Sequence, residues 1–134
     1  MIVLDASVLI AHLDSSDLHH AAARRLLEES GGTPLAASAI TLAETLVFPA
    51  RSGRLEDAES ALRRLGVEEV AIGGDAGPRL ATLRAGTGLK MPDCCVLLAA
   101  LDREAVLASF DSSLLASARE LKLETAPKKA ADTV

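Results

Sequence analysis

Four acidic residues stand where carboxylates could take part in chemistry, because each begins or interrupts an apolar segment. They are Asp5, Glu44, Asp93 and Asp111. Carboxylate oxygens suit hard divalent cations such as Mg²⁺ and Mn²⁺, whereas Zn²⁺ prefers His and Cys side chains in closer groupings. Such a cation lowers the pKa of a bound water, orients it toward a phosphodiester and stabilises the departing oxygen. The set therefore predicts a hard-metal site, and phosphodiester hydrolysis is the chemistry that such a site could carry out.

Two of the acids share one local pattern. Asp5 ends the run IVL and opens ASVLIA, and Asp111 ends VLASF and opens SSLL. Each one alone is explained by capping the helix that follows it. Two carboxylates that end parallel strands lie at the same edge of the sheet, however, and repel each other unless a cation lies between them. Capping alone is therefore a weaker explanation for the pair.

The other two acids lie in helical segments. Asp93, in MPDCCVLLAA, suits the positive end of a helix dipole, but the seven residues after it are all apolar. A helix of this kind is buried, so its first turn is expected to point the carboxylate inward or at a cleft. Glu44 interrupts ITLAETLVF, where Ile40, Val47 and Phe48 can share its side of the helix. This favours partial burial, and a partly buried Glu needs a partner.

An alternation of strands and helices must position these acids. It predicts a three-layer α/β domain with a mostly parallel central sheet of four or five strands. Ligands of such sheets bind at the carboxyl ends of the strands, where Asp5 and Asp111 are expected. Strands are predicted at 2–4, 34–37, 67–72, 105–110 and 123–125. Helices are predicted at 6–13, 40–51, 54–65, 75–85, 92–101 and 111–118. One more helix is predicted to begin at the cap candidates 14–17 and to end at 29.

Length and composition limit the remaining possibilities. The 134 residues predict a single domain over 1–126, followed by an Ala- and Lys-rich tail at 127–134 that is expected to fray. The chain lacks Trp and Tyr, so nucleic acid would be held by charge and metal more than by aromatic stacking. The net charge of -5 argues against non-specific binding of a polyanion. Cations bound in an acidic cluster would reverse that sign locally.

The two cysteines, Cys94 and Cys95, are adjacent. They cannot build a disulfide framework or a four-ligand zinc site, and their apolar surroundings predict core packing. A reducing cytoplasm fits this pattern best. The first residues, MIVLDASVLIAHLD, have no basic region before a long apolar run, so neither a signal peptide nor a membrane segment is expected.

Together and in this order, the four acidic segments resemble the PIN-domain nucleases, and among them the VapC-type toxin ribonucleases of type II toxin–antitoxin systems. The segments are IVLDASVLIAHLD, ITLAETLVF, LKMPDCCVLLAA and VLASFDSSLL, and the resemblance covers almost the whole chain. It implies a PIN-like α/β/α sandwich in which the four acids ligate Mg²⁺ or Mn²⁺, directly or through water, and carry catalysis. Ser7 matches the family's hydroxyl position, and Ser109 is a further supporting candidate; the ligands would be Asp5, Glu44, Asp93 and Asp111.

The same resemblance implies an endoribonuclease toxin. It would hydrolyse single-stranded or looped RNA, form a homodimer, and be inhibited by a small antitoxin that inserts a basic side chain into the acidic site. A few basic residues would then make the contacts to RNA, although most of these residues are expected to be ordinary surface charges. The candidates are Arg51, Arg54, Arg79, Arg84 and Lys90.

Other interpretations remain open. A PIN nuclease that serves RNA processing, or a PIN-like interaction module without catalysis, would carry the same fold. A phosphatase with Asp5 as nucleophile fits poorly, because Ser7 stands where that class has a second Asp. His19 and His20 are expected to be solvated helix residues, and His12 is a minor candidate for the site.

Overall fold

Five short strands form one sheet in the computed structural model of the chain, which describes residues 1–128. The order of the strands across the sheet is β3-β2-β1-β4-β5, and each neighbouring pair runs parallel. The predicted α/β class is confirmed, and the described sheet is parallel throughout. The strands are β1 (Ile2–Leu4), β2 (Leu35–Ser38), β3 (Val67–Val70), β4 (Val106–Ala108) and β5 (Thr125–Ala126).

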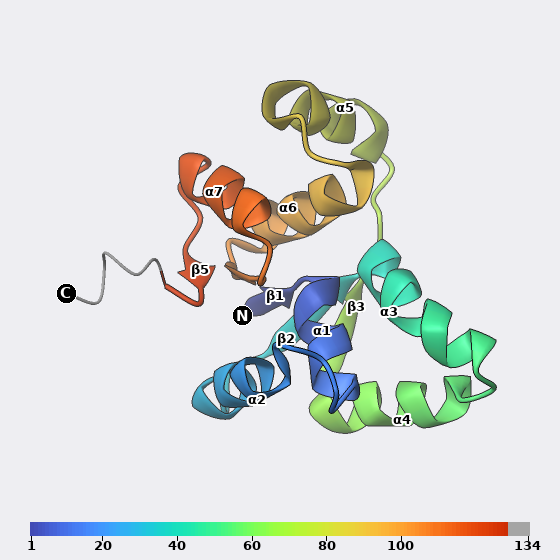
Figure 1. The fold of residues 1–134 in the computed structure, drawn as a ribbon. Helices are drawn as coiled ribbons and strands as arrows, with labels where there is room; N and C mark the ends of the chain where they lie inside the picture. Colours follow the sequence, from blue (N-terminus) through green and yellow to red (C-terminus); the bar gives the residue numbers. More distant parts are fainter. Residues whose placement is uncertain (129–134) are drawn as a thin grey trace.

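Helices cover both faces of this sheet (Figure 1). Every strand and helix expected from the sequence is present, with ends that differ by a few residues. Most of the tail that was expected to fray lies at 129–134, outside the described residues. The helices are α1 (Ala6–Leu13), α2 (His20–Glu29), α3 (Ala39–Arg51), α4 (Leu55–Leu65), α5 (Ala76–Thr87), α6 (Met91–Arg103) and α7 (Ser112–Glu120). None of the helices in the described residues has the length and apolar character that crossing a membrane requires.

Alternate side chains of β1 enter two different cores. Val3 packs with α6 and α7, whereas Ile2 and Leu4 pack with α1 and α2 on the opposite face. Burial on both faces explains why the strand is apolar at every position and does not alternate with polar residues. The central part of α6 is buried along its whole length, from Cys94 to Ala100, as the apolar sequence predicts. Both cysteines are free and buried, which confirms their expected place in the core.

The order of the strands places a crevice beside the centre of the sheet. The chain builds β2 and β3 on one side of β1, and then crosses to add β4 and β5 on the other side. Residues that follow β1 and β4 therefore meet at the switch point, where parallel sheets bind ligands. Asp5 N donates a hydrogen bond of 2.9 Å to the carbonyl oxygen of Ala108, which joins the two strand ends.

Candidate metal centre

Asp5 is the buried member of the acidic set. It is 7% exposed, and its Oδ2 accepts hydrogen bonds of 2.8 Å from the hydroxyls of Ser7 and Ser109. It occupies the N-cap position of α1, but its side chain accepts no hydrogen bond from the helix backbone. Capping therefore does not explain this residue. Two hydroxyl groups replace the hydrogen bonds with water that this carboxylate loses on burial.

The two serines are themselves fixed by the loop between β4 and α7. Ser7 Oγ accepts a hydrogen bond of 3.0 Å from the backbone N–H of Phe110, and Ser109 Oγ accepts one of 2.9 Å from the N–H of Asp111. Because each hydroxyl oxygen accepts from the backbone, its proton is directed to Asp5. Within residues 1–128, no hydrogen bond reaches Oδ1 of Asp5, so this oxygen is available to a ligand.

Asp93 lies in the first turn of α6 and is half-buried, as its apolar surroundings predict. Its pKa is raised to about 6, first by burial and then by the negative charges of Asp5, Asp111 and Glu44, while Lys90 acts in the opposite direction. Because the charges of three other acids contribute to this shift, all three lie within electrostatic reach of Asp93. The fold therefore brings together carboxylates that are far apart in the sequence.

Glu44 corrects one expectation. It is exposed rather than partly buried, because α3 turns Thr41 and Thr45 toward the protein and leaves Val47 and Phe48 44% and 75% exposed. Protein atoms near its carboxyl group still displace enough water to raise its pKa, and the charge of Asp5 adds to this effect. Glu44 is thus a solvent-exposed member of the acidic group.

Asp111 is both a helix cap and a member of the acidic group. Its Oδ1 accepts hydrogen bonds of 2.9 and 3.1 Å from the backbone N–H groups of Ser113 and Leu114, at the start of α7. The residue is exposed, and its charge contributes to the raised pKa of Asp93. Capping accounts for one oxygen of this carboxylate, and the second oxygen makes no such contact.

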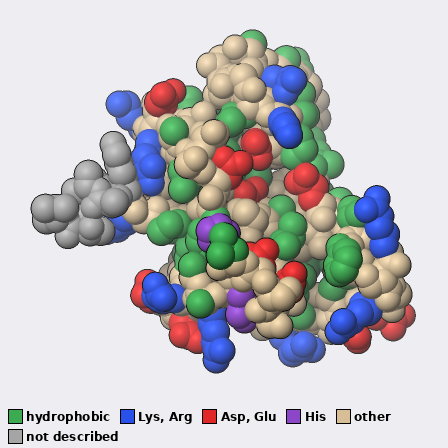
Figure 2. Space-filling view, in the orientation of Figure 1, with side chains coloured by type: hydrophobic (Ala, Val, Ile, Leu, Met, Phe, Trp, Pro, Cys, Tyr) green, Lys and Arg blue, Asp and Glu red, His purple; other side chains and the backbone are tan. Residues whose placement is uncertain are grey.

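The chemistry of these donors fits a hard divalent cation. The group offers only oxygen atoms, and a bound cation would offset the repulsion among the acids that adds to the effect of burial on the pKa of Asp93. Figure 2 shows acidic side chains gathered near the centre of one face of the molecule. Within residues 1–128, no three acidic, imidazole or thiol side chains form a ready chelate. An oxygen-only donor set of this kind fits Mg²⁺, which keeps several of its waters when bound to proteins.

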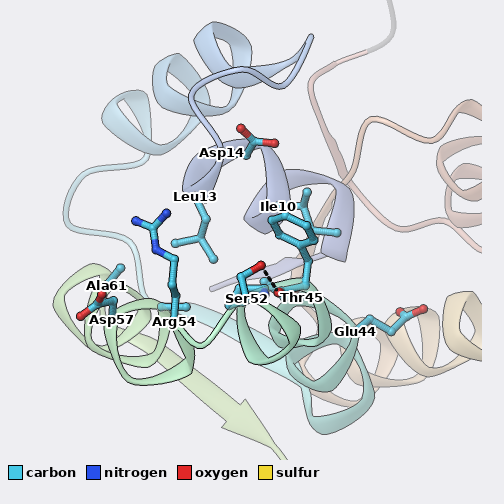
Figure 3. Close-up of a pocket in the computed structure, with 12 residues that line it drawn as sticks. Ile10, Leu13, Asp14, Glu44, Thr45, Ser52, Arg54, Asp57 and Ala61 are labelled. Carbon is cyan, nitrogen blue, oxygen red and sulfur yellow. Dashed lines mark hydrogen bonds between the residues drawn. The ribbon is translucent and has the colours of Figure 1, made fainter.

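A groove of about 460 Å³ lies beside this centre rather than over it. Helices α1, α3 and α4 form its walls, and Figure 3 shows side chains from all three turned toward it. Its lining is mainly apolar, with Ile10, Leu13 and Phe48 among the side chains. Glu44 is the member of the acidic group that also lines the groove. The groove and the acidic centre are therefore neighbouring sites that meet at this residue.

The five basic candidates are mostly surface residues, as expected. Arg79 pairs with Asp102, at 2.5 Å between Nη2 and Oδ1, and Arg84 donates to a backbone carbonyl. Lys90 differs, because it precedes α6 and lowers the pKa of Asp93 by its charge. Lys90 is thus the basic candidate that the structure links electrostatically to the acidic group.

One feature near the acids was not foreseen from the sequence. The ring of His19, a residue expected to be merely solvated, stacks on the ring of Phe110 with centroids 4.8 Å apart and planes inclined by 19°. His19 is exposed, in agreement with the expectation. Its contact with the residue before Asp111 had no signal in the sequence, since the two segments are distant along the chain. His12 is half-buried, and its pKa is lowered by burial and by the charge of His20.

Comparisons with known proteins agree with this architecture. The chain matches no curated protein sequence. Among solved structures, a toxin–antitoxin complex from Klebsiella pneumoniae superposes with a TM-score of 0.71 at 25% identity, over 84% of this chain and 88% of that one. The VapC20 toxin of Mycobacterium tuberculosis, described as cleaving the sarcin–ricin loop, gives 0.68 at 19% identity, over 87% and 95%. VapBC2 from Rickettsia felis, bound to a promoter DNA fragment, gives 0.70 at 18%, over 93% and 97%.

The family assignment rests on the sequence as well as on the shape. A family profile described as the PIN domain matches residues 2–121, which include all four acidic positions. The five-stranded parallel sheet with helices on both faces is consistent with the α/β/α sandwich of that family. The chain belongs to the PIN domain family.

Proposed function

We propose that this chain is a Mg²⁺- or Mn²⁺-dependent endoribonuclease that acts as the toxin of a toxin–antitoxin pair. One observation carries the proposal: Ser109 donates to Asp5 and accepts the N–H of Asp111, and the charges of these two acids and of Glu44 contribute to the raised pKa of Asp93. These acids come from four separate parts of the chain, and they meet where parallel sheets bind ligands. An acidic centre at that edge suits a cation and, through the cation, a phosphate group.

Each acid has its own part in the proposed site. Asp5 presents the buried, fixed carboxylate and Asp93 the half-buried one, while Glu44 and Asp111 lie nearer solvent. Together they would hold the cation directly or through water. A bound Mg²⁺ or Mn²⁺ would supply Lewis acidity to an RNA phosphodiester.

Neighbouring groups orient this centre. The hydroxyls of Ser7 and Ser109 hold one oxygen of Asp5 and so fix the direction of the other, as partners of metal-binding carboxylates commonly do. Lys90 provides a positive charge within electrostatic reach of Asp93. A phosphate of the RNA backbone is the natural partner for that ammonium group.

The similar structures support the choice of substrate and partner. One of them is described as a toxin that cleaves the sarcin–ricin loop, and another is a toxin–antitoxin complex. We therefore infer that a looped RNA is the substrate and that a small antitoxin is the inhibitor. The resemblance to the VapC-type toxins adds the proposal that the active form is a homodimer. The apolar groove that ends at Glu44 offers the antitoxin a surface from which a basic side chain could reach the acids.

The test is cleavage of a pool of hairpin RNAs with randomised loops, in Mg²⁺, in Mn²⁺ and in EDTA. Wild-type protein should cleave members of the pool only with the metal present. Asp5→Asn and Asp93→Asn should abolish cleavage while leaving the circular dichroism spectrum unchanged. Glu69→Gln is the matched control, because this exposed acid lies on β3, outside the acidic group, and should leave cleavage unchanged.

The outcomes separate the competing functions. Unchanged cleavage in the Asp5 and Asp93 variants would refute the site. Absence of cleavage by wild-type protein in both metals would favour an interaction module. Cleavage without harm to a bacterial host on expression would favour a nuclease of RNA processing over a toxin.

A further inference from the structure

His19 and Phe110 form an aromatic pair at the edge of the acidic centre. His19 precedes α2, and Phe110 lies in the loop between β4 and α7. Their rings are nearly parallel, with centroids 4.8 Å apart. The chain contains no Trp or Tyr and two Phe residues, of which the other, Phe48, lines the groove. Phe110 is thus the Phe residue that adjoins Asp111, whereas Phe48 shares the groove with Glu44.

The link between this pair and the acidic centre is direct. Phe110 follows Ser109 and precedes Asp111, and its backbone N–H donates to Ser7 Oγ at 3.0 Å. Both serines in turn donate to Asp5. A short, hydrogen-bonded segment therefore fixes the position of the Phe110 ring relative to the buried carboxylate.

Exposure differs between the two rings. Phe110 is half-buried and packs against the core on the α1 and α2 side of the sheet, whereas His19 is exposed. Within residues 1–128, the imidazole of His19 makes no hydrogen bond, so stacking is the contact that orients it. The ring of Phe110 thus covers one face of the His19 imidazole, and the rest of the imidazole is exposed to solvent.

The loop that carries His19 is held by its own hydrogen bonds. The backbone N–H of His19 donates to Asp17 Oδ1 at 2.8 Å, and Asp14 Oδ1 accepts from both the N–H and the hydroxyl of Ser16. Leu18, the residue before His19, is 92% exposed. These hydrogen bonds therefore hold a loop in which the imidazole of His19 and the side chain of Leu18 are both exposed to solvent.

We propose that the exposed face of His19, supported by Phe110, is a stacking platform for one unpaired base of the RNA substrate, next to the bond that is cleaved. This inference rests on the proposed ribonuclease function. Unpaired bases in RNA loops commonly stack on aromatic and His side chains, and such stacking tolerates different bases because every base has a flat π-face. A base on His19 would leave its own phosphate close to Asp111, which follows Phe110, and to Asp5, which the preceding Ser109 holds by a hydrogen bond.

Binding can be tested without cleavage in the Asp5→Asn background. Hairpin RNAs carry the fluorescent base 2-aminopurine at one loop position at a time, and stacking quenches its emission. Quenching at one position is expected with Asp5→Asn, and its loss is expected with Asp5→Asn combined with His19→Ala. His19→Phe should retain the quenching, whereas Leu18→Ala, which removes apolar surface but no ring from the same loop, should not affect it.

Kinetics provide the second readout. For the hairpin that wild-type protein cleaves best, His19→Ala should raise KM about tenfold with kcat nearly unchanged, in keeping with the usual strength of base stacking. His19→Phe should restore KM. Phe110→Leu, which keeps an apolar side chain against the core, should raise KM in the same way as His19→Ala.

The results have distinct meanings. No quenching at any position, or an unchanged KM in His19→Ala, would overturn the platform even if cleavage is normal. Restoration by His19→Lys but not by His19→Phe would also overturn it, because the contact would then be with a phosphate. Quenching in Asp5→Asn, combined with absence of cleavage by the wild-type protein in both metals, would overturn the nuclease and leave base stacking on His19 standing.

Discussion

Ser109 and Asp5 are 104 residues apart in the sequence, yet the hydroxyl of Ser109 donates a hydrogen bond of 2.8 Å to Oδ2 of Asp5. Ser109 is completely buried, and its oxygen also accepts the backbone N–H of Asp111. One side chain thus joins the ends of β1 and β4 and links two of the acids. The contact ties the two strand ends on either side of the crevice to each other.

Removing this hydroxyl should weaken the site. Ser109→Ala leaves one oxygen of Asp5 with a single donor and deprives the N–H of Asp111 of its acceptor. Cleavage and Mn²⁺ affinity should fall about 10- to 100-fold, a common result of losing a group that orients a metal ligand. The unsatisfied buried groups should also lower the free energy of unfolding by about 1–3 kcal/mol.

A matched serine separates the site effect from general damage. Ser117 is half-buried on α7 and has no side-chain hydrogen bond within the described residues. Ser117→Ala should preserve both RNA cleavage and Mn²⁺ affinity, measured by calorimetric titration. Full activity and unchanged affinity in Ser109→Ala would show that this serine serves only the fold.

Removing the charge of Asp93 should stabilise the metal-free protein at neutral pH. The pKa of Asp93 is about 6 in the folded chain and 3.8 in a model peptide, so between these values the folded state binds more protons than the unfolded state. Stability therefore falls as pH rises through this interval, and the penalty is complete above pH 6. Asp93→Asn should melt at a higher temperature than wild type in EDTA above pH 6, with the difference vanishing near pH 4.

Thermal melts of both proteins across this pH range check the sign. Asp102→Asn is unsuitable as a control because Asp102 pairs with Arg79. Glu69→Gln serves instead, and it should follow wild type at each pH. A lower melting temperature for Asp93→Asn at neutral pH would contradict the repulsion inferred for this group.

Divalent cations should stabilise the folded protein. Binding to the native state alone adds about 2.7 kcal/mol when the free metal reaches one hundred times its dissociation constant. The melting temperature of wild type should rise with Mn²⁺ and then level off in step with occupancy. The rise should disappear in Asp5→Asn and persist in Glu69→Gln. A flat melting temperature up to millimolar Mn²⁺ would contradict a metal site in these residues.

Two substitutions of Asp111 distinguish its role as the cap of α7 from its proposed role in the metal centre. Asn keeps an oxygen that accepts the N–H groups of Ser113 and Leu114, so Asp111→Asn should retain the cap of α7 and lose only the charge. Asp111→Ala loses both, and should cost about 1 kcal/mol more in chemical denaturation. If Asp111 belongs to the metal centre, both variants should cleave RNA poorly. Wild-type activity in Asp111→Asn would assign this residue to helix capping alone.

Local sequence predicted the elements of the fold well. The apolar runs before Asp5 and before Asp111 indicate strands, and the unbroken apolar run after Asp93 indicates a buried helix; the structure has all three. These predictions succeed because the backbone geometry of a strand or helix and its preference for burial depend on residues close together in the chain.

The environment of individual side chains was harder to predict. Glu44 was expected to be partly buried, since the apolar residues of α3 leave several faces that could contact the core. The structure buries the face with Thr41 and Thr45 and exposes Phe48. The face that a helix buries is decided by its neighbours, and here α1, α4 and α6 pack against α3. Periodicity within the helix does not contain that information.

The sequence by itself determined the alternation of strands and helices, the four acids at the ends or within apolar segments, and the suitability of those acids for a hard cation. The tertiary structure alone decided which distant groups meet: Ser109 with Asp5, and His19 with Phe110. The physical reason is the order of the strands. The crossover that places β4 beside β1 brings distant segments to one edge of the sheet, and local patterns in the chain do not encode that contact.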